Sequence, residues 1–485
     1  DLEEDRVPGV SAARTYRELL VDRQPLRTVV VAVIDGGVDT THVDLRETLW
    51  RNEDEQPDNR VDDDGNGYVD DVWGWNFIGG PDGRNVRHET LEVTRLHAAC
   101  SGGEEPPRDL TCARISAAFE ERRAETEETL QRIEQLSAAL DFALPVLARE
   151  AGVPESELTP AIVREISALQ QAVVQAKSIY LQLHGAGLGR PELEEAAEAY
   201  QSLLEYGLDP TFDAREVVAD DPSDGSERIY GNRDVMGPDP SHGTHVAGII
   251  GAVRGNGIGI DGIADGVRLM TVRAVPDGDE RDKDVANAIR YAVDNGADII
   301  NMSFGKAFSP QKSLVDDAVR YAEEHGVLMI HAAGNDGEDI EVEASYPTPE
   351  YLEGGRAEGW IEVGAANWSV DGLAAPFSNY GRTRVDVFAP GMDILSTYPG
   401  SDFRREDGTS MAAPVVTGVA ALLMAYFPEL TASEVKRIIL ESSTKYVDVE
   451  VPRPGSDELV PFGELSATGG VVNAYAAVRM ALEMM

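Results

Sequence analysis

Long hydrophobic runs, basic residues and cysteine are all scarce in this sequence, and each shortage excludes a class of protein. No stretch approaches the ~18 consecutive apolar residues of a membrane-spanning helix, so we expect no membrane span. Only 42 residues are basic against 87 acidic, which gives a formal net charge of −45. So negative a chain repels nucleic acid backbones and anionic lipids, and its expected partners are cations instead. Six of the basic residues are lysine; adaptation to high salt, a calcium-rich exterior and a biased genome composition each account for this shortage.

The two cysteines, Cys100 and Cys112, flank a loop, SGGEEPPRDLT, that has no helix or strand pattern. A disulfide here would stabilise the fold by roughly 3 kcal/mol and would fit an oxidising compartment. Two free thiols are the alternative. The sequence begins at Asp1 rather than Met and shows no signal-peptide pattern. We therefore expect that a targeting segment or propeptide has been removed and that the protein is secreted or extracytoplasmic.

Strand-like and helix-like segments alternate through much of the chain. The run RTVVVAVIDGG from Arg27 predicts a buried strand that ends at Asp35, and residues 268–275, 297–305 and 326–335 have the same apolar character. Between the later strands, DVANAIRYAVDNG and SLVDDAVRYAEEHG have helical apolar spacing and end at glycine. Such alternation predicts an α/β fold, a parallel sheet with helices on both faces.

Residues 85–229 depart from this pattern and are expected to be mostly helical. Apolar residues there follow a heptad spacing, at Ile162, Ile166, Leu169, Val173, Ala176, Tyr180 and Leu183. Two further helical stretches, 115–147 and 193–204, complete an expected hairpin of two or three antiparallel helices. We therefore predict one discontinuous domain, residues 1–84 and 230–485, with a helical insertion at 85–229. The insertion could be a lid, a stabilising brace, or a surface for partner docking or self-association.

Several polar residues follow the expected strands, where the ligand-binding edge of an open parallel sheet lies. Asp35 ends the first strand and Asn335 follows the fourth. In PSHGTHVAGII, His242 and His245 have the spacing of a metal-binding pair, but the glutamate of a zinc protease motif and a third ligand are missing. One histidine as a general base, with the other packed beneath it, is the better interpretation.

Ser410, in DGTSMAAPVV, comes just before a long apolar helix. Serine at this position is commonly a helix cap. A nucleophile at the positive end of the helix, with small neighbours that admit a second chain, is the functional alternative.

Four segments in fixed order resemble the signature motifs of the subtilisin-like serine endopeptidases (subtilases, peptidase family S8): VIDGGVDTTHVDL, HGTHVAGIIGA, AAGN and DGTSMAAPVVTGVAALL. The resemblance covers about residues 25–84 and 230–485 and implies a three-layer α/β/α fold. It also implies that Ser410 is the nucleophile, His242 the general base and Asp35 the residue that orients it. Asn335 would donate to the oxyanion.

The same resemblance implies two substrate-binding segments. An extended substrate would add as a strand along Ser303, Phe304 and Gly305. Ala332, Ala333 and Gly334 would line the primary specificity pocket.

An acidic loop, RVDDDGNGYVDDVWGW, has the alternating carboxylates of a calcium-binding loop. Its candidate ligands are Asp62, Asp64, Asn66, the Tyr68 carbonyl, and Asp70 or Asp71, but the glutamate that normally closes such a loop is missing. A solvated acidic loop is the alternative. The family resemblance implies a second calcium site, built from Asp44, Asn256 and the carbonyls of Arg254, Ile258 and Ile260.

These features together predict a secreted, calcium-stabilised serine endopeptidase whose partners are a protein or peptide substrate and a removed propeptide. The competing hypothesis is a catalytically silent protein of the same fold that uses the helical insertion as a binding interface.

Overall fold

The computed structural model describes residues 7–107, 110–167 and 169–485, and the chain divides into two compact units. Unit 1 combines the chain up to Glu92 with Asp213–Met485, and unit 2 is Val93–Phe212. The first six residues of the expected 1–84 segment lie outside the described part. Both unit boundaries fall within the expected 85–229 insertion.

A mostly parallel sheet forms the centre of unit 1, which confirms the predicted fold class. Within the described residues it has nine strands in the order β10-β13-β7-β6-β5-β4-β1-β3-β2. The strands are β1 (Val29–Asp35), β2 (Gly74–Asn76), β3 (Val267–Arg273), β4 (Ile299–Met302), β5 (Leu328–Ala332), β6 (Trp360–Ala366), β7 (Val387–Pro390), β10 (Thr444–Lys445) and β13 (Gly470–Val471). Only β10 and β13 pair antiparallel. Two hairpins lie outside the sheet, β8 (Ile394–Tyr398) with β9 (Asp402–Glu406) and β11 (Glu450–Pro452) with β12 (Leu459–Pro461).

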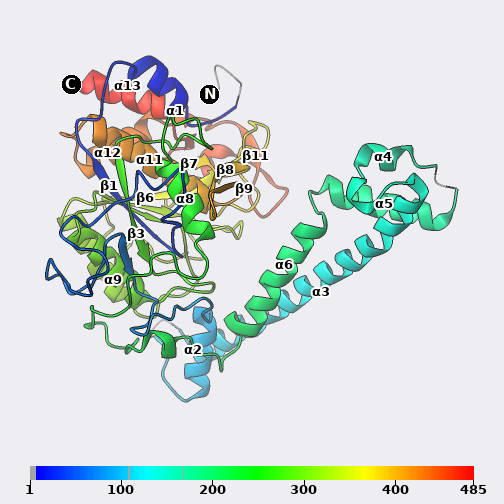
Figure 1. Cartoon of the computed structure of the whole chain (residues 1–485), viewed down its shortest axis with the longest axis horizontal. Coiled ribbons are helices and arrows are strands. Elements are labelled where there is room, and N and C mark those ends of the chain that lie inside the picture. The colour runs from blue at the N-terminus through cyan, green and yellow to red at the C-terminus, as the bar shows by residue number, and fades with distance from the viewer. Residues whose placement is uncertain (1–6, 108–109, 168) are drawn as a thin grey trace. The chain divides into compact units, whose positions relative to one another are not determined.

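Helices cover the sheet, as Figure 1 shows for α11 and α12 on one side and α9 on the other. The helices of unit 1 are α1 (Ala12–Arg14), α7 (Arg215–Val218), α8 (Ser241–Gly251), α9 (Asp282–Asp294), α10 (Lys312–Glu324), α11 (Thr409–Tyr426), α12 (Ala432–Ser442) and α13 (Ala474–Met484). Val31 and Val33 of β1 share a fully buried core with Val246 of α8 and Val416 of α11. This packing fixes the first turns of α8 and α11 near the carboxyl end of β1.

Of the described helices, α11 alone is long and apolar enough to cross a membrane by length and composition, with a mean hydropathy of 1.5. Small and polar residues interrupt this segment, so it contains no run of 18 consecutive apolar residues. In the structure 94% of this segment is buried inside the protein.

Unit 2 has a hydrophobic core of its own. It contains α3 (Cys112–Ala151), α4 (Pro160–Glu165), α5 (Gln171–Gly185) and α6 (Arg190–Ser202), and it begins within α2 (Glu92–Ser101). Leu147 of α3, Val163 of α4 and Ala176 of α5 are fully buried in this core. A disulfide joins Cys100 at the end of α2 to Cys112 at the start of α3.

The heptad spacing predicted one helix in unit 2, but the helix is interrupted. The prediction that Leu169 lies on the buried face is wrong. The chain leaves the helix at Ile166 and re-enters it at Gln171, and Leu169 is 95% exposed. Lys177 of α5 donates to the carbonyl oxygens of Arg164 and Ile166, so it caps the end of α4. This cap and the shared core favour two short helices folded on each other over one continuous helix.

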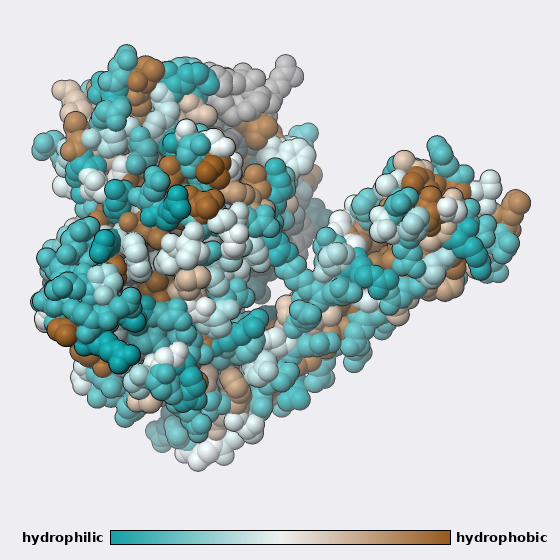
Figure 2. Space-filling view, viewed as in Figure 1, coloured by the Kyte–Doolittle hydropathy of each residue, from teal (hydrophilic) through white to brown (hydrophobic). Residues whose placement is uncertain are grey.

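Lysine is scarce and mostly buried. Lys283, Lys306 and Lys312 are each less than 10% exposed and pair with carboxylates at 2.5–2.8 Å. Lys177 and Lys436 are half-buried, and Lys445 is exposed. Hydrophilic side chains dominate the face seen in Figure 2, which fits the acidic composition.

Candidate active site

Asp35 and His242 meet at the carboxyl end of the sheet. Asp35 is the last residue of β1 and is 2% exposed, and His242 is the second residue of α8. His242 Nδ1 lies 2.9 Å from Asp35 Oδ1 and 3.0 Å from Oδ2. Because an ionised carboxylate only accepts, Nδ1 carries the proton and Nε2 keeps its lone pair for a reacting group.

The charge of Asp35 also sets the basicity of His242. Burial disfavours the charged ring, but the Asp35 carboxylate outweighs it and raises the pKa of His242 above its ordinary value. Glu406 and Asp239 act in the same direction. The His242 side chain remains 41% exposed, so a substrate can reach it.

Gly243 permits the close approach of these two residues. A Cβ atom at this position would lie 2.2 Å from the Gly37 carbonyl oxygen and 3.0 Å from Asp35 Oδ1. The glycine of the HGTH motif is therefore a packing requirement of the Asp35–His242 contact.

Ser410 is the second residue of α11, where peptide N–H groups have no partner within the helix. Its Oγ donates to the Ser303 carbonyl oxygen at 3.0 Å, and Ser303 Oγ donates back to the Ser410 carbonyl oxygen at 3.0 Å. Ser410 is thus tied to the chain that leaves β4, and its hydroxyl is directed at Ser303 rather than at His242.

Asn335 lies beside the same helix start with a defined amide orientation. Its Oδ1 accepts from the Thr409 backbone N–H and from Thr409 Oγ1, both at 2.9 Å. Since a backbone N–H is always a donor, the facing atom is the oxygen, and Nδ2 is the free end of the amide. Asn335 is exposed, so this donor is accessible.

The two predicted substrate-binding segments lie next to Ser410. Gly305 is exposed, and among the described residues its peptide N–H and C=O have no hydrogen-bond partner. On the other segment, Gly334 has φ of 107°, and a Cβ there would lie 2.3 Å from Asn379 Nδ2. Ala332 and Ala333 are buried under this turn.

Ser345, which the motifs did not single out, lies between these two segments. Its Oγ is 2.6 Å from an ideal Cβ at Gly305 and 3.5 Å from one at Gly334. A side chain at Gly305 would clash with Ser345 Oγ, so Ser345 packs closely against the predicted substrate-binding segments. Its signal in the sequence was weak, because a lone serine in a loop has many roles.

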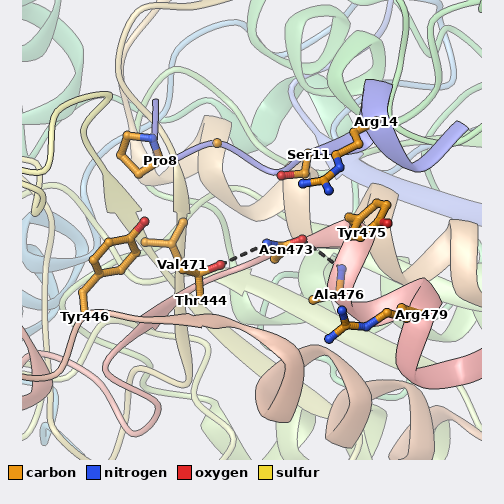
Figure 3. Close-up of a pocket in the computed structure, with 11 residues that line it drawn as sticks. Pro8, Ser11, Arg14, Thr444, Tyr446, Val471, Asn473, Tyr475, Ala476 and Arg479 are labelled. Carbon is orange, nitrogen blue, oxygen red and sulfur yellow. Dashed lines mark hydrogen bonds between the residues drawn. The ribbon is translucent and has the colours of Figure 1, made fainter. Parts of the chain in front are cut away.

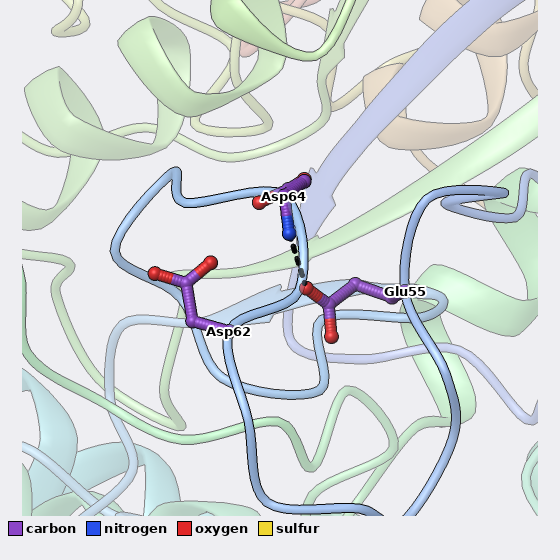
Figure 4. Close-up of side chains that lie close together, drawn as sticks. All are labelled: Glu55, Asp62 and Asp64. Atoms are coloured by element: carbon purple, nitrogen blue, oxygen red, sulfur yellow. Dashed lines mark hydrogen bonds between the residues drawn. The ribbon is translucent and has the colours of Figure 1, made fainter.

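The acidic loop gathers Asp62 and Asp64 with Glu55, a residue that the sequence reasoning missed (Figure 4). Carboxylate oxygens of the three lie within 4.8 Å of one another. Glu55 Oε1 accepts from the backbone N–H groups of Asp63 and Asp64, whereas its buried Oε2 has no hydrogen-bond partner in the described chain. Burial raises the pKa of Glu55. Glu55, which precedes the loop in the chain, thus adds a third carboxylate to the cluster.

The other predicted ligands of this loop lie around the cluster or away from it. Asn66 Nδ2 donates to Asp64 and to the buried Asp71, so Asn66 links these carboxylates. Asp71 also accepts from Tyr291. Asp70 instead pairs with Arg233 at 2.8 Å, which leaves it unsuited to a metal ion. Tyr68, whose carbonyl was a candidate, donates its backbone N–H to Asn66 Oδ1.

The two side chains of the second expected calcium site, Asp44 and Asn256, are in contact. Asn256 Nδ2 donates to Asp44 Oδ1 at 2.6 Å, and the Ile260 N–H donates to Asp44 Oδ2 at 3.2 Å. The Ile258 N–H donates to Asn256 Oδ1. Arg254, the remaining member, lies at the start of the same loop. Both Asp44 oxygens accept from protein donors, whereas the Glu55 cluster includes an oxygen, Glu55 Oε2, without such a donor.

His245 packs beneath the site, as predicted. It is fully buried, and its Nε2 lies 3.0 Å from the Ile394 carbonyl oxygen and 3.1 Å from that of Arg404. Burial lowers the pKa of His245 to about 4, so its ring stays neutral.

A pocket of about 270 Å³ lies elsewhere, between Pro8–Arg14 and residues 444–479 (Figure 3). None of the predicted site residues lines it.

A histidine oriented by a buried aspartate, with a serine at a helix start at the same end of the sheet, is the set of residues that serine hydrolases use. Among serine hydrolases, the chain order Asp, His, Ser on a parallel sheet is the order found in subtilisin. The profile of the Subtilase family matches residues 27–463, and the chain belongs to that family. This confirms the resemblance of the four motifs.

Individual relatives share parts of the chain. The thermophilic serine proteinase of Bacillus sp. (strain AK1) is 45% identical over 185 residues, which are 38% of this chain and 42% of the relative. Subtilisin NAT of Bacillus subtilis subsp. natto is 38% identical over 215 residues, 43% of this chain and 51% of the relative. The chain thus spans about half the length of these curated relatives. A solved protease structure from Pseudoalteromonas arctica PAMC 21717 is 30% identical, with a TM-score of 0.42, and the match covers 52% of this chain and 79% of that one.

Proposed function

We propose that this protein is a serine endopeptidase that hydrolyses peptide bonds in proteins through an acyl-enzyme. The observation that carries the proposal is the pair of contacts from His242 Nδ1 to Asp35, which leaves Nε2 available as a base. Family membership and the serine proteinase relatives support it.

In the proposed reaction, Ser410 Oγ leaves the Ser303 carbonyl, gives its proton to His242 Nε2 and attacks the substrate carbonyl carbon. Contacts of this kind are often loose before substrate binds. Asp35 stabilises the imidazolium that forms, and His242 returns the proton to the leaving amine. Water then repeats the sequence on the acyl-enzyme and releases the acid.

The oxyanion of the tetrahedral intermediate would lie between the Ser410 backbone N–H and Asn335 Nδ2. Both donors are fixed before the reaction, one by the first turn of α11 and the other by Thr409. Preorganised donors stabilise developing charge without reorganisation during the reaction.

The substrate backbone would pair with the free peptide groups of Gly305. Open N–H and C=O groups at an exposed edge accept an added strand, and this addition gives affinity without strict sequence preference. Ala332, Ala333, Gly334 and Ser345 would surround the side chain next to the cleaved bond.

Labelling with a fluorophosphonate probe tests the proposal, because this reagent requires an activated serine. We expect covalent modification at Ser410, located by peptide mass mapping, and casein hydrolysis that the Ser410→Ala variant loses. If folded protein is neither labelled nor able to degrade casein, the chain is the silent scaffold instead.

We further propose that Glu55, Asp62 and Asp64 bind a calcium ion that stabilises the loop. The orphaned, buried Glu55 Oε2 supports this, because an uncompensated buried carboxylate oxygen is costly and a hard cation offsets that cost. The ion would hold the loop in place and would take no part in peptide hydrolysis.

We also propose that the protein is extracytoplasmic. In addition, we propose that unit 2 binds a partner or a second copy of the chain. The Cys100–Cys112 disulfide supports the first, since such bonds persist in oxidising compartments. The self-contained core of unit 2 supports the second, because the unit does not need its surface for its own folding. Light scattering across a concentration series tests for self-association.

A further inference from the structure

A fully buried histidine, His331, lies beneath the substrate-binding edge and takes no part in the steps above. It belongs to β5 and lies directly beside Glu362 of the neighbouring parallel strand β6. Leu328 and Ile330 of β5 pack in the core that contains α11. Because side chains alternate along a strand, His331 points to the opposite face of the sheet.

A chain of hydrogen bonds fixes the ring of His331 at both nitrogens. Trp360 Nε1 donates to Glu362 Oε2 at 2.8 Å, and Glu362 Oε1 lies 2.8 Å from His331 Nδ1. On the other side, His331 Nε2 lies 2.8 Å from the carbonyl oxygen of Phe304. A peptide carbonyl only accepts, so Nε2 carries the proton that faces Phe304.

The charges around His331 favour this donor. Burial alone would lower the pKa of the ring, but Glu362, with smaller contributions from the Phe304 carbonyl and Glu280, raises the pKa of His331 above its ordinary value. Glu362 itself is 3% exposed. A buried pair of this kind adds little net stability and is costly to break, so a role in orientation is a reasonable expectation.

Phe304 is the central residue of the edge that the substrate would join. The carbonyl before it, on Ser303, accepts from Ser410 Oγ, and the residue after it is the exposed Gly305. A Phe304 carbonyl that is held inward therefore also fixes the orientation of the peptide groups of its two neighbours. The Ser303 carbonyl faces the Ser410 hydroxyl, and the peptide groups of Gly305 face the exposed edge.

We propose that His331 is a positioning residue for substrate binding, held by Glu362 and acting through the carbonyl of Phe304, an inference that rests on the proposed peptidase function. The peptide groups with which a substrate would pair at Gly305 are thus held in position before the substrate binds. His331 touches neither the substrate nor the reacting atoms.

Two substitutions test the two ring nitrogens of His331 separately. His331→Gln places an amide N–H near the position of Nε2, so it keeps a donor for Phe304 and loses the contact with Glu362. His331→Asn places its amide near the position of Nδ1, so it keeps the partner of Glu362 and loses the donor. Kinetics on a peptide of four residues before the cleaved bond, the rate of fluorophosphonate labelling and the melting temperature are measured for each.

We expect His331→Asn to raise KM about tenfold, with a labelling rate within about twofold of the parent protein. His331→Gln should restore KM to within about threefold. His42→Gln is the matched control, since His42 is also fully buried and also contacts a backbone carbonyl oxygen, that of Asp402 at 3.0 Å. It should lower the melting temperature without changing KM.

Equal KM values for the Asn and Gln variants, or changes that follow only the melting temperature, would show that His331 has a purely structural role. If His331→Asn does not fold, Trp360→Phe removes only the outermost donor of the chain, and an unchanged KM in that variant overturns the proposal. Failure of the parent protein to label would instead refute the peptidase function, so the two failures are distinct.

Discussion

His242 Nδ1 lies 2.9 Å from Asp35 Oδ1, although 207 residues separate the two in the chain. Unit 2 accounts for most of that separation, yet the contact is the one that a serine hydrolase requires. A long insertion is tolerated here because the cost of closing a loop grows only slowly with its length.

The raised pKa of His242 predicts the acid limb of the pH profile. The base must be neutral to accept a proton, so kcat/KM should fall as the pH drops through the raised pKa, above the ordinary value of about 6.5. The Asp35→Asn variant removes the charge that raises this pKa, so its limb should move to lower pH. The orientation of His242 would also be lost, and activity should fall roughly 10⁴-fold. A limb that is unchanged between the two proteins would contradict this account.

Asn335→Asp tests the oxyanion donor. The new carboxylate keeps an oxygen for Thr409 but replaces the donor Nδ2 with a second acceptor. In subtilisin itself, loss of this amide slows turnover by roughly 10²–10³-fold, and we expect at least that loss in kcat with little change in KM. Asp336→Asn, a change at the next and exposed position, should leave kcat near the parent value. Equal effects at the two positions would argue against the role of Asn335.

Removal of calcium should lower the melting temperature by several degrees. A ligand at about 100 times its dissociation constant stabilises a protein by about 2.7 kcal/mol, which chelation with EGTA would remove. Glu55→Gln should abolish most of this chelator-sensitive part, whereas Glu53→Gln, an exposed change on the same segment, should preserve it. Differential scanning fluorimetry with and without EGTA measures both. Identical melting of the parent protein under the two conditions would refute the calcium site.

Leu147→Ala tests whether unit 2 folds independently. Leu147 is fully buried in the core of that unit, so its truncation should cost about 2–5 kcal/mol there. We expect a separate, earlier transition in calorimetry, with the rate of Ser410 labelling unchanged below it. A single transition that shifts as a whole would instead mean that the two units unfold together.

The fold of unit 1 was predictable where short motifs carry strong local constraints. The apolar run before Asp35 becomes β1, and the small residues around Ser410 mark the start of α11 as expected. Both features depend on residues that are close in sequence. The apolar run forms a buried strand, and the small residues begin a helix.

The features that the sequence did not reveal depend on contacts between distant segments. Glu55 joins Asp62 and Asp64 only because the loop folds back, and the break between α4 and α5 depends on Lys177. Neither spacing nor composition encodes such contacts locally. His331 is a further case, since its partner Glu362 is 31 residues away on the next strand.

The burial of lysine has a practical consequence for chemical modification. Three of the six lysine side chains are enclosed in ion pairs, two are partly covered, and Lys445 alone is well exposed. Acylating reagents directed at lysine should therefore react mainly at Lys445. Modification of that amine would leave arginine still carrying the positive charge of the surface.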